Sequence, residues 1–274
     1  MRPGVEVHSS TKKTKVQFCF KSHLCRVKFL LLFSFVLLTF RVSAQFTLIH
    51  SHNDYRQEQP LMQALKQRVF CVEADVYLVG DKLLVAHDTA ELATAPTLDE
   101  MYLQPIVELF NKNNNKISED SNYVLTLMID IKKNGPEVIK VLAEKLKLYP
   151  QVFDRKVNNK GVWIIISGDR GKQTSWTSYP HFILFDGRPH EKYDSLVFRK
   201  VALISDSYSN YSKNPDSTDI KIQLMAYKVH NLDRLVRLWG IPDNPESWKL
   251  LLSLSVDIIN TDKVEECRRY FGKK

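Results

Sequence analysis

Histidines and carboxylates recur in this sequence as pairs whose members are two residues apart. The pairs are His50 with His52, Glu73 with Asp75, and Asp130 with Lys132. Because residues i and i+2 of a β-strand point to the same face, each pair would present its polar groups together. Carboxylates crowded into one pocket repel each other unless a cation or protons compensate. The acids therefore predict a site for one divalent cation held by Glu73, Asp75 and Asp130, and all-oxygen ligation favours Mg²⁺ or Ca²⁺ over zinc.

A second reading of these acids stays open. Glu73 or Asp130 would then form a buried ion pair with Lys132, as a single polar residue in an apolar strand often does. Three successive strands that each end in inward-pointing charges are not explained in that way. We therefore favour the metal site.

A further histidine, His87, follows the apolar residues 83–86. An unperturbed imidazole has a pKa of about 6.5, so two imidazoles suit a general base and a general acid on opposite sides of a phosphoryl centre. We expect His52 and His87 to form this catalytic pair beside the metal. His50 points the same way as His52 and is the alternative catalytic histidine.

Short apolar runs rich in β-branched residues predict the strands that position these groups. The predicted strands are residues 46–50, 69–76, 124–131, 162–167, 182–185, 200–204, 235–239 and 256–259. Helical patterns lie between them, most clearly at 97–111, 136–148 and 245–254, and Thr97 to Glu100 resembles a capping box. Strands that alternate with helices indicate an α/β fold of the TIM, (β/α)₈-barrel class, whose site lies at the C-terminal ends of the strands.

Two segments depart from this regular alternation. Residues 76–88 predict a small β-hairpin after the second strand, with Gly80 and Asp81 at its turn. Residues 205–228 are rich in loop-forming residues, so the helix expected there is the least defined of the fold.

The first 44 residues have the pattern of an export signal. Residues 1–28 are basic, residues 29–40 carry no charge, and small residues follow up to Ala44. We expect a signal peptide over residues 1–44 and a domain over residues 45–274 that is exported, either periplasmic or secreted. Twelve apolar residues reach roughly 18 Å as a helix, too short for a hydrocarbon core of about 30 Å, but an uncleaved signal anchor is the alternative.

The basic excess of the chain belongs to this first segment. Residues 1–44 contain eight of the 39 Lys and Arg residues and one of the 31 acids, so the net charge of +8 nearly vanishes without them. The charge therefore gives no argument for a nucleic-acid partner. A content of 44% apolar and 26% charged residues excludes disordered and multi-span membrane chains. Cys71 and Cys267 remain in the domain, either as free buried thiols or as a pair.

Taken together, these motifs resemble the glycerophosphodiester phosphodiesterases, which share a barrel with phosphatidylinositol-specific phospholipase C and the sphingomyelinase D toxins. The pieces that carry the resemblance are Ser51-His52-Asn53-Asp54, Glu73-Ala74-Asp75-Val76, Leu83-Leu84-Val85-Ala86-His87-Asp88, Asp130-Ile131-Lys132, and residues 236–243 and 256–262. The opening H-S-H-N-D-Y is similar in particular to the branch that contains the fungal "altered inheritance of mitochondria" proteins. The resemblance spans about residues 48–262.

The resemblance implies a phosphoric diester hydrolase, or lyase, that acts on a glycerophosphodiester or phospholipid-type substrate by His/His acid–base catalysis with one Mg²⁺ or Ca²⁺. The expected catalytic groups are His52, His87 and Lys132. The expected metal ligands are Glu73, Asp75 and Asp130. The expected substrate-binding groups are His50, Asn53 and Trp239. Core packing is the alternative role of Trp239. The expected partner is a small phosphodiester or lysophospholipid, which is compatible with peripheral membrane contact, and the sequence does not indicate an oligomeric state.

The sequence also departs from this family. The family's H-R-G is replaced by His52-Asn53-Asp54, so its phosphate-contacting arginine is missing. Pro60-Leu61-Met62 replaces an element with a downstream acid, and Asp130 stands where a glutamate is usual, as in the sphingomyelinase D pattern. Arg170 and Arg188 follow predicted strands and could contact substrate, but we favour solvated loop arginines. The resemblance therefore indicates the substrate only weakly.

Two other functions fit part of the pattern. In a metallohydrolase of the amidohydrolase or histidinol-phosphatase type, His50 and His52 would bind zinc or a pair of metals. The later histidines that such a site needs are poorly placed: they are His181, His190 and His230. The other function is a non-catalytic barrel that binds a phosphorylated or lipid ligand, which the missing arginine favours.

Overall fold

The structure, a computed structural model, describes residues 47–272. The expected signal peptide, residues 1–44 with Cys19 and Cys25, lies outside the described residues. Within residues 47–272, no helix combines the length and the apolar character needed to cross a membrane. Cys71 and Cys267 are both buried and are free thiols rather than a pair.

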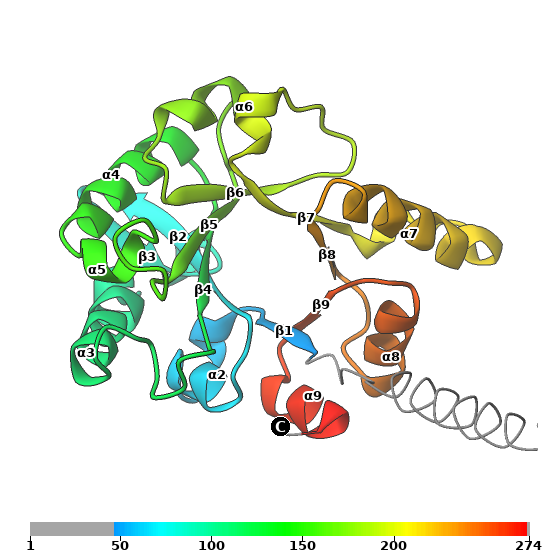
Figure 1. Ribbon diagram of the computed structural model, residues 1–274, viewed down its shortest axis with the longest axis horizontal. Helices are drawn as coiled ribbons and strands as arrows, with labels where there is room; N and C mark the ends of the chain where they lie inside the picture. The colour runs from blue at the N-terminus through cyan, green and yellow to red at the C-terminus, as the bar shows by residue number, and fades with distance from the viewer. Residues whose placement is uncertain (1–46, 273–274) are drawn as a thin grey trace, which may run out of the picture. The chain divides into compact units, whose positions relative to one another are not determined.

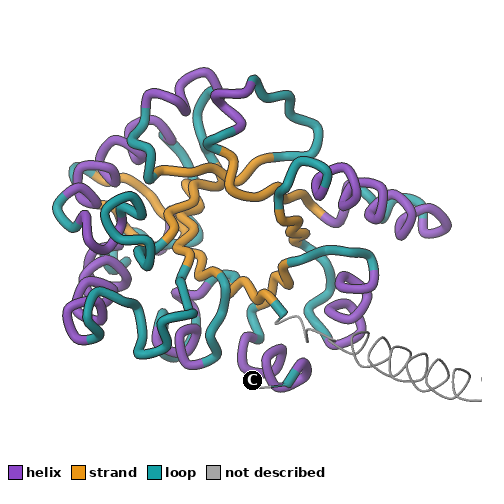
Figure 2. The backbone as a smooth tube through the Cα atoms, in the orientation of Figure 1, coloured by secondary structure: helices purple, strands orange, loops and turns teal. Residues whose placement is uncertain are grey.

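Eight parallel strands close into a barrel, which Figure 2 shows as a ring of strands inside a layer of helices. The ring strands are β1 (Leu48–Ser51), β2 (Cys71–Val79), β4 (Thr126–Ile131), β5 (Trp163–Gly168), β6 (Ile183–Gly187), β7 (Val201–Ser207), β8 (Leu235–Trp239) and β9 (Ile258–Thr261). The ring closes at β1, because His50 lies opposite Cys71 of β2 on one side and opposite Asn260 of β9 on the other. The predicted (β/α)₈ barrel is therefore confirmed.

The predicted hairpin is also present, outside the ring. Strand β3 (Lys82–Val85) pairs antiparallel with the end of β2, and Val85 lies opposite Val76. The turn between the two strands contains Gly80, whose φ of 61° lies in the left-handed region that glycine adopts at little cost. This hairpin sets the position of the segment that follows it, which carries His87.

Helices cover the outside of the barrel (Figure 1). They are α2 (Met62–Lys66), α3 (Gln104–Lys112), α4 (Gly135–Lys147), α5 (Pro150–Phe153), α6 (Ser195–Phe198), α7 (Pro215–His230), α8 (Pro245–Ser253) and α9 (Val264–Phe271). Helical turns of the 3₁₀ type lie at Asp54–Arg56, Thr89–Glu91, Gln173–Ser178 and Tyr208–Asn210, and a π-helical turn lies at Asp99–Leu103. The expected capping box exists, since the Glu100 amide donates to Thr97 Oγ1 at 3.1 Å and the Thr97 amide donates to Glu100 Oε2 at 2.9 Å.

Helix α7 is longer and better defined than the sequence suggested for residues 205–228. Its start is fixed by the side chain of Asn214, which accepts a hydrogen bond from the amide of Asp216 at 3.1 Å. The pattern was hard to read because apolar residues lie on both sides of the helix: Met225 is buried, whereas Leu224 is 53% exposed. Such a helix has no single apolar stripe.

Candidate active site

Every ring strand carries an apolar residue inside the barrel and a polar residue two positions later. The pairs are Leu48 and His50, Cys71 and Glu73, Met128 and Asp130, Ile165 and Ser167, Leu184 and Asp186, Leu203 and Ser205, Leu235 and Arg237, and Ile258 and Asn260. Because side chains two apart share a face, the apolar members fill one level of the barrel and the polar members form the level above it, nearer the C-terminal ends of the strands. The site is built on this polar level.

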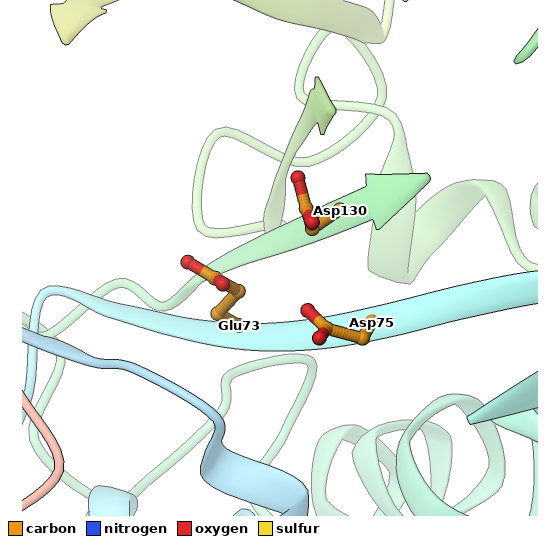
Figure 3. Close-up of side chains that lie close together, drawn as sticks. All are labelled: Glu73, Asp75 and Asp130. Atoms are coloured by element: carbon orange, nitrogen blue, oxygen red, sulfur yellow. The ribbon is translucent and has the colours of Figure 1, made fainter. Parts of the chain in front are cut away.

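The three predicted metal ligands lie together at that end of the barrel. Glu73 and Asp75 come from β2, and Asp130 comes from β4, directly opposite Asp75 in the sheet. One carboxylate oxygen of each lies within 4.8 Å of the others, and Figure 3 shows the three side chains converging. The side-chain period of the strand and the register between β2 and β4 thus produce the acidic cluster.

Protein cations already contact one oxygen of each carboxylate. The ammonium of Lys132 lies 2.7 Å from Asp75 Oδ2 and 2.6 Å from Asp130 Oδ2, and Arg237 Nη1 lies 3.1 Å from Glu73 Oε2. The second oxygen of Asp75, Oδ1, is buried and has no hydrogen-bond partner among the described residues. An unpartnered buried carboxylate oxygen beside two further acids fits a hard divalent cation, so the cluster suggests a divalent metal.

The charges of the cluster shift its pKa values in opposite directions. Burial and the charge of Glu73 raise the pKa of Asp130, against the opposing effect of Lys132. For Glu73, burial would raise the pKa, but the hydrogen bond with His50 and the charge of Arg237 outweigh it and the pKa is lowered. Burial likewise opposes the charge of Lys132, yet the carboxylates of Asp130 and Asp75 raise its pKa. Lys132 therefore forms the ion pair with Asp130 that was the alternative reading of the acids, and it also pairs with Asp75.

His52 follows β1 and lies beside Glu73, at one side of the acidic cluster. Its Nδ1 lies 2.9 Å from Asp262 Oδ1 and 3.0 Å from the amide nitrogen of Asn53, and its Nε2 lies 3.9 Å from Glu73 Oε1. The carboxylate of Asp262 favours a proton on Nδ1. The imidazole is one-third exposed to solvent, with 33% of its side-chain surface accessible. Burial alone would lower its pKa, but the hydrogen bond with Asp262 and the charge of Glu73 raise it above the ordinary value.

His87 lies on the other side, beside Asp75. Its Nδ1 is 2.9 Å from Asp75 Oδ2, which also accepts a hydrogen bond from the hydroxyl of Tyr55 at 2.9 Å. The backbone amide of His87 donates to Glu91 Oε2 at 2.8 Å and so fixes the segment after the hairpin. Each of the two predicted histidines is thus held through Nδ1 by a carboxylate, which leaves Nε2 of each imidazole for proton transfer.

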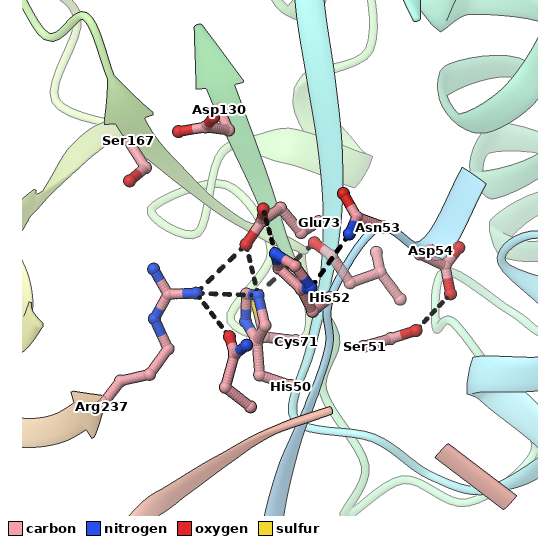
Figure 4. Close-up of polar contacts among 12 residues, drawn as sticks. His50, Ser51, His52, Asn53, Asp54, Cys71, Glu73, Asp130, Ser167 and Arg237 are labelled. Carbon is pink, nitrogen blue, oxygen red and sulfur yellow. Dashed lines mark hydrogen bonds and ion pairs between the residues drawn. The ribbon is translucent and has the colours of Figure 1, made fainter. Parts of the chain in front are cut away.

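His50 was expected to bind substrate, and the structure places it below the cleft instead. It is fully buried, and its Nε2 lies 2.5 Å from Glu73 Oε2 and 2.9 Å from Arg237 Nη1 (Figure 4). Burial and the charge of Arg237 lower the pKa of His50 to about 4. His50 and His52 share a face, but two residues separate them by about 7 Å along the strand, which takes His50 to the polar level and leaves His52 at the opening.

The other two expected substrate-binding residues do line the cleft. Asn53 has a φ of 47°, and its amide oxygen lies 2.9 Å from the hydroxyl oxygen of Tyr55. Trp239, at the end of β8, lies against two guanidinium groups, with its ring centroid 4.9 Å from Arg188 and 5.6 Å from Arg237. Trp239 therefore contributes to the cleft rather than only to the core.

Two arginines of the site were missed in the sequence. Arg188 was expected to be solvated, but its Nη1 lies 2.8 Å from Asp186 Oδ2 and donates to Ser205 Oγ at 3.1 Å. Arg237 Nη2 lies 3.3 Å from the same carboxylate oxygen. The charges of both arginines lower the pKa of Asp186 in spite of its burial. The signal available in the sequence was the polar residue two positions after each apolar run, as in Leu184 and Asp186.

These side chains enclose a cleft of about 240 Å³ at the C-terminal end of the barrel. Its lining residues are His52, Asn53, Glu73, Asp75, His87, Asp130, Lys132, Ser167, Gly168, Arg188, Arg237 and Trp239. Acids are concentrated on the β2 and β4 side, whereas Arg188 and Arg237 occupy the β6 and β8 side. A cleft with a cation site on one side and guanidinium groups on the other suits a small anion such as a phosphate ester.

Comparison with known proteins confirms the predicted resemblance. Residues 39–170 match the AIM6-like phosphodiesterase domain. Over 269 residues, the chain is 26% identical to altered inheritance of mitochondria protein 6 of Eremothecium gossypii, covering 82% of this chain and 69% of that protein. It is also 26% identical over 266 residues to the homolog from Arthroderma benhamiae, covering 81% of this chain and 83% of the homolog. The domain match supports a phosphodiesterase.

Solved structures support the same fold. A glycerophosphodiester phosphodiesterase from Parabacteroides distasonis superposes with a TM-score of 0.54 at 18% identity, covering 82% of this chain and 96% of that one. An Oleispira antarctica phosphodiesterase, solved with the product sn-glycerol-3-phosphate, gives a TM-score of 0.51 at 13% identity over 81% of this chain and 96% of that one. At these identities the likeness shows a shared barrel.

Proposed function

We propose that this chain, a relative of the AIM6-like phosphodiesterases, is a metal-dependent phosphoric diester hydrolase that acts on a small glycerophosphodiester or phospholipid-type substrate. The observation that carries the proposal is the placement of two imidazoles around one acidic cluster. His52 lies beside Glu73 and His87 lies beside Asp75, and each is oriented by a carboxylate through Nδ1. General acid–base catalysis needs this arrangement of two proton carriers flanking one reacting centre.

In this proposal Glu73, Asp75 and Asp130 hold one Mg²⁺ or Ca²⁺. The unpartnered Oδ1 of Asp75 and the all-oxygen donor set support that choice. When bound, a divalent cation offsets the negative charge of phosphate oxygens. Lys132 stays between Asp75 and Asp130, so it reduces the repulsion of the acids and adds a positive charge beside the phosphate.

The protein's own groups perform the proton transfers. The Nε2 of one imidazole removes the proton from the attacking hydroxyl or water, and the Nε2–H of the other protonates the leaving alcohol. Asp262 and Asp75 keep the two rings in the required tautomer. Arg188 takes the place of the arginine that is missing after His52 and contacts the phosphate oxygens from the β6 side of the cleft.

A zinc site built from histidines has less support. His50 is buried against Glu73 and Arg237, and of the described histidines only His52 and His87 line the cleft. His181 precedes β6, at the opposite end of the strands, and pairs with Asp154.

The proposal includes export, with residues 1–44 removed as a signal peptide. The test is N-terminal sequencing of the protein recovered from the cell exterior or periplasm. A chain that begins at Gln45 is expected, whereas a full-length chain retained in the membrane fraction would favour the signal anchor.

The enzymatic proposal is tested with a panel of glycerophosphodiesters, lysophospholipids and bis-p-nitrophenyl phosphate, with and without chelator. Phosphorus NMR identifies the products and distinguishes hydrolysis from cyclic phosphate formation. We expect turnover that chelator abolishes and that Mg²⁺ or Ca²⁺ restores. Ligand binding without turnover of any substrate would contradict the proposal and favour a non-catalytic barrel, and restoration by zinc alone would contradict the choice of metal.

A further inference from the structure

A second cavity, of about 500 Å³, lies beside the catalytic cleft between helix α7 and the loop that follows β6. Arg188 lines both the cleft and this cavity, which we call the α7 groove. The two cavities therefore share one residue, and that residue is the guanidinium that faces the phosphate in the proposed function.

The groove exists because the barrel lacks a full helix at this point. Helix α6 is a single turn of four residues, Ser195–Phe198, and the seven residues before it form an extended loop (Figure 1). A longer α6 would pack against the side of α7 and cover it, as consecutive helices do in a (β/α)₈ barrel. Without that cover, apolar side chains of α7 remain at the surface.

The floor of the groove is apolar and its rim is exposed. Ile204, Met225 and Val229 form the buried part, with 2%, 7% and 3% of their surfaces accessible. Leu224 and Leu232 lie at the rim and are 53% and 49% exposed. An open groove with this lining gains free energy when an apolar chain covers it.

The charges of the groove favour an occupant attached to an anion. Lys221 and Lys228 line it, and neither forms an ion pair with a described residue. Two acids also line it: Glu191 pairs with Arg170, and Asp206 accepts hydrogen bonds from Asn210 and Tyr211, which line the groove as well. The cations Lys221, Lys228 and Arg188 outnumber these two acids. The excess positive charge disfavours a cationic ligand and attracts a phosphate-linked one.

The geometry of Arg188 connects the two cavities. Its Nη1 is fixed by Asp186 and Ser205, and the guanidinium lies over the ring of Trp239 in the cleft. A phosphodiester whose oxygens contact this guanidinium has two ester substituents, one on each side of the phosphorus. One substituent stays in the polar cleft, and the other is at the entrance of the α7 groove.

We propose that the α7 groove binds an unbranched alkyl substituent of the phosphodiester, so that the preferred substrate is amphiphilic. This inference rests on the proposed phosphodiesterase function. It predicts that chain length on one ester group changes turnover although the chemistry at phosphorus stays the same. A buried methylene contributes about fourfold to an affinity, so a chain that buries two or three of them is expected to raise kcat/KM by at least about tenfold.

The test compares methyl p-nitrophenyl phosphate with octyl p-nitrophenyl phosphate, which release the same chromogenic group. We expect the full-length protein to favour the octyl ester. Leu224→Lys places a charge at the rim, and since Leu224 is half-exposed the variant is expected to fold. It is expected to lower kcat/KM for the octyl ester about tenfold and to leave the methyl ester unchanged. Leu148→Lys, at a residue that is 72% exposed and does not line the groove, is the matched control.

An octyl-to-methyl ratio near one, or a ratio that Leu224→Lys does not change, would overturn the inference while leaving the proposed function intact. If neither ester is hydrolysed, the substrate panel described above tests the proposed function, and calorimetry with octyl methyl phosphate tests whether the groove binds an alkyl chain. Binding by the wild type that Leu224→Lys abolishes would support the alkyl site, and no binding would overturn it. A dimer in sedimentation that Leu224→Lys dissociates would also overturn it, since a second copy would then cover the groove.

Discussion

The Nδ1 of His52 and the Oδ1 of Asp262 lie 2.9 Å apart although 210 positions separate the two residues. Closure of the barrel makes this contact, because β9 pairs with β1 and ends one residue before Asp262. The carboxylate orients the imidazole and raises its pKa against the effect of burial. Asp262 is thus a positioning residue for the proposed proton transfer.

Asp262→Asn is expected to lower kcat at least about tenfold, because an amide can stabilise the other tautomer of His52 and no longer supports the imidazolium. Steady-state kinetics on bis-p-nitrophenyl phosphate measure the effect. Asp154→Asn is the control. Asp154 Oδ1 lies 2.7 Å from His181 Nε2, and this pair does not line the cleft. Equal kcat values for the two variants would show that the contact with Asp262 does not matter for catalysis.

The strands and the acidic cluster could be predicted from the sequence because both depend on local patterns. Apolar, β-branched runs mark the ring strands, and the spacing of Glu73 and Asp75 puts both carboxylates on one face. The hairpin follows from Gly80 in the same way. The pair of Glu73 and Asp75 and the hairpin need no knowledge of which strands are neighbours, whereas Asp130 joins the pair through the register between β2 and β4.

The remaining parts of the site depend on contacts between distant strands, and for that reason the sequence did not reveal them. Asp186 brings Arg188 and Arg237 together only because β6, β7 and β8 are adjacent in the ring. The sequence also did not show that His50 lies below the cleft. The alternation of side chains along a strand gives the face to which a residue points but not its level along the barrel. Helix α7 was underestimated because its apolar residues serve both the core and an open groove.

Arg188→Gln is expected to lower kcat/KM for phosphodiesters about 10- to 100-fold, the usual loss for a charge-assisted hydrogen bond to a phosphate oxygen. The loss should appear mainly in KM if Arg188 contacts the substrate in the ground state. Arg155→Gln is the control, because Arg155 donates to the carbonyl oxygen of Gly161 and does not line the cleft. An equal effect of Arg155→Gln and Arg188→Gln would contradict the assignment.

Gly168→Ala tests the geometry of the metal site. Gly168 has a φ of 64°, and a Cβ there would lie 2.7 Å from Asp130 Oδ1 and 2.3 Å from the carbonyl oxygen of Ile131. Gly80→Ala is a close control, since Gly80 has a φ of 61° but no atom within 4 Å of the added Cβ. Both variants should lose about 1–2 kcal/mol of stability from the left-handed backbone. Gly168→Ala should lose more than Gly80→Ala, because its Cβ also meets the carbonyl oxygen of Ile131.

The two glycine variants should differ in metal binding. Only Gly168→Ala displaces Asp130, so it should weaken the stabilisation of the fold by Ca²⁺ or Mg²⁺, measured as the shift of Tm with metal concentration. The same Tm shift in both variants would show that the backbone beside Asp130 does not shape a metal site.

Glu191 gives a pH-dependent prediction about the loop that carries Arg188. Burial would raise the pKa of Glu191, but hydrogen bonds from Arg170 and Tyr193 lower it from 4.5 to about 2. A lowered carboxyl pKa stabilises the folded state above the unfolded pKa, and this contribution is lost as the pH falls from about 4.5 towards 2. Glu191→Gln should therefore destabilise the protein at about pH 6 and have a smaller effect at about pH 3.

Denaturant unfolding of the wild type and the Glu191→Gln variant at both pH values measures this difference. Glu108→Gln is the control, because Glu108 is exposed on α3. A loss of stability in Glu191→Gln that is the same at both pH values would mean that the charge of Glu191 is not what holds the loop.

The most direct test of the central claim is the hydrolysis of bis-p-nitrophenyl phosphate by a His52→Ala, His87→Ala double variant. We expect turnover at least about 10²-fold below the wild type, the contribution of general acid–base catalysis, with the fold retained by circular dichroism. The control His181→Ala should match the wild type. Turnover by the double variant within a few-fold of the wild type would contradict the assignment of the two histidines.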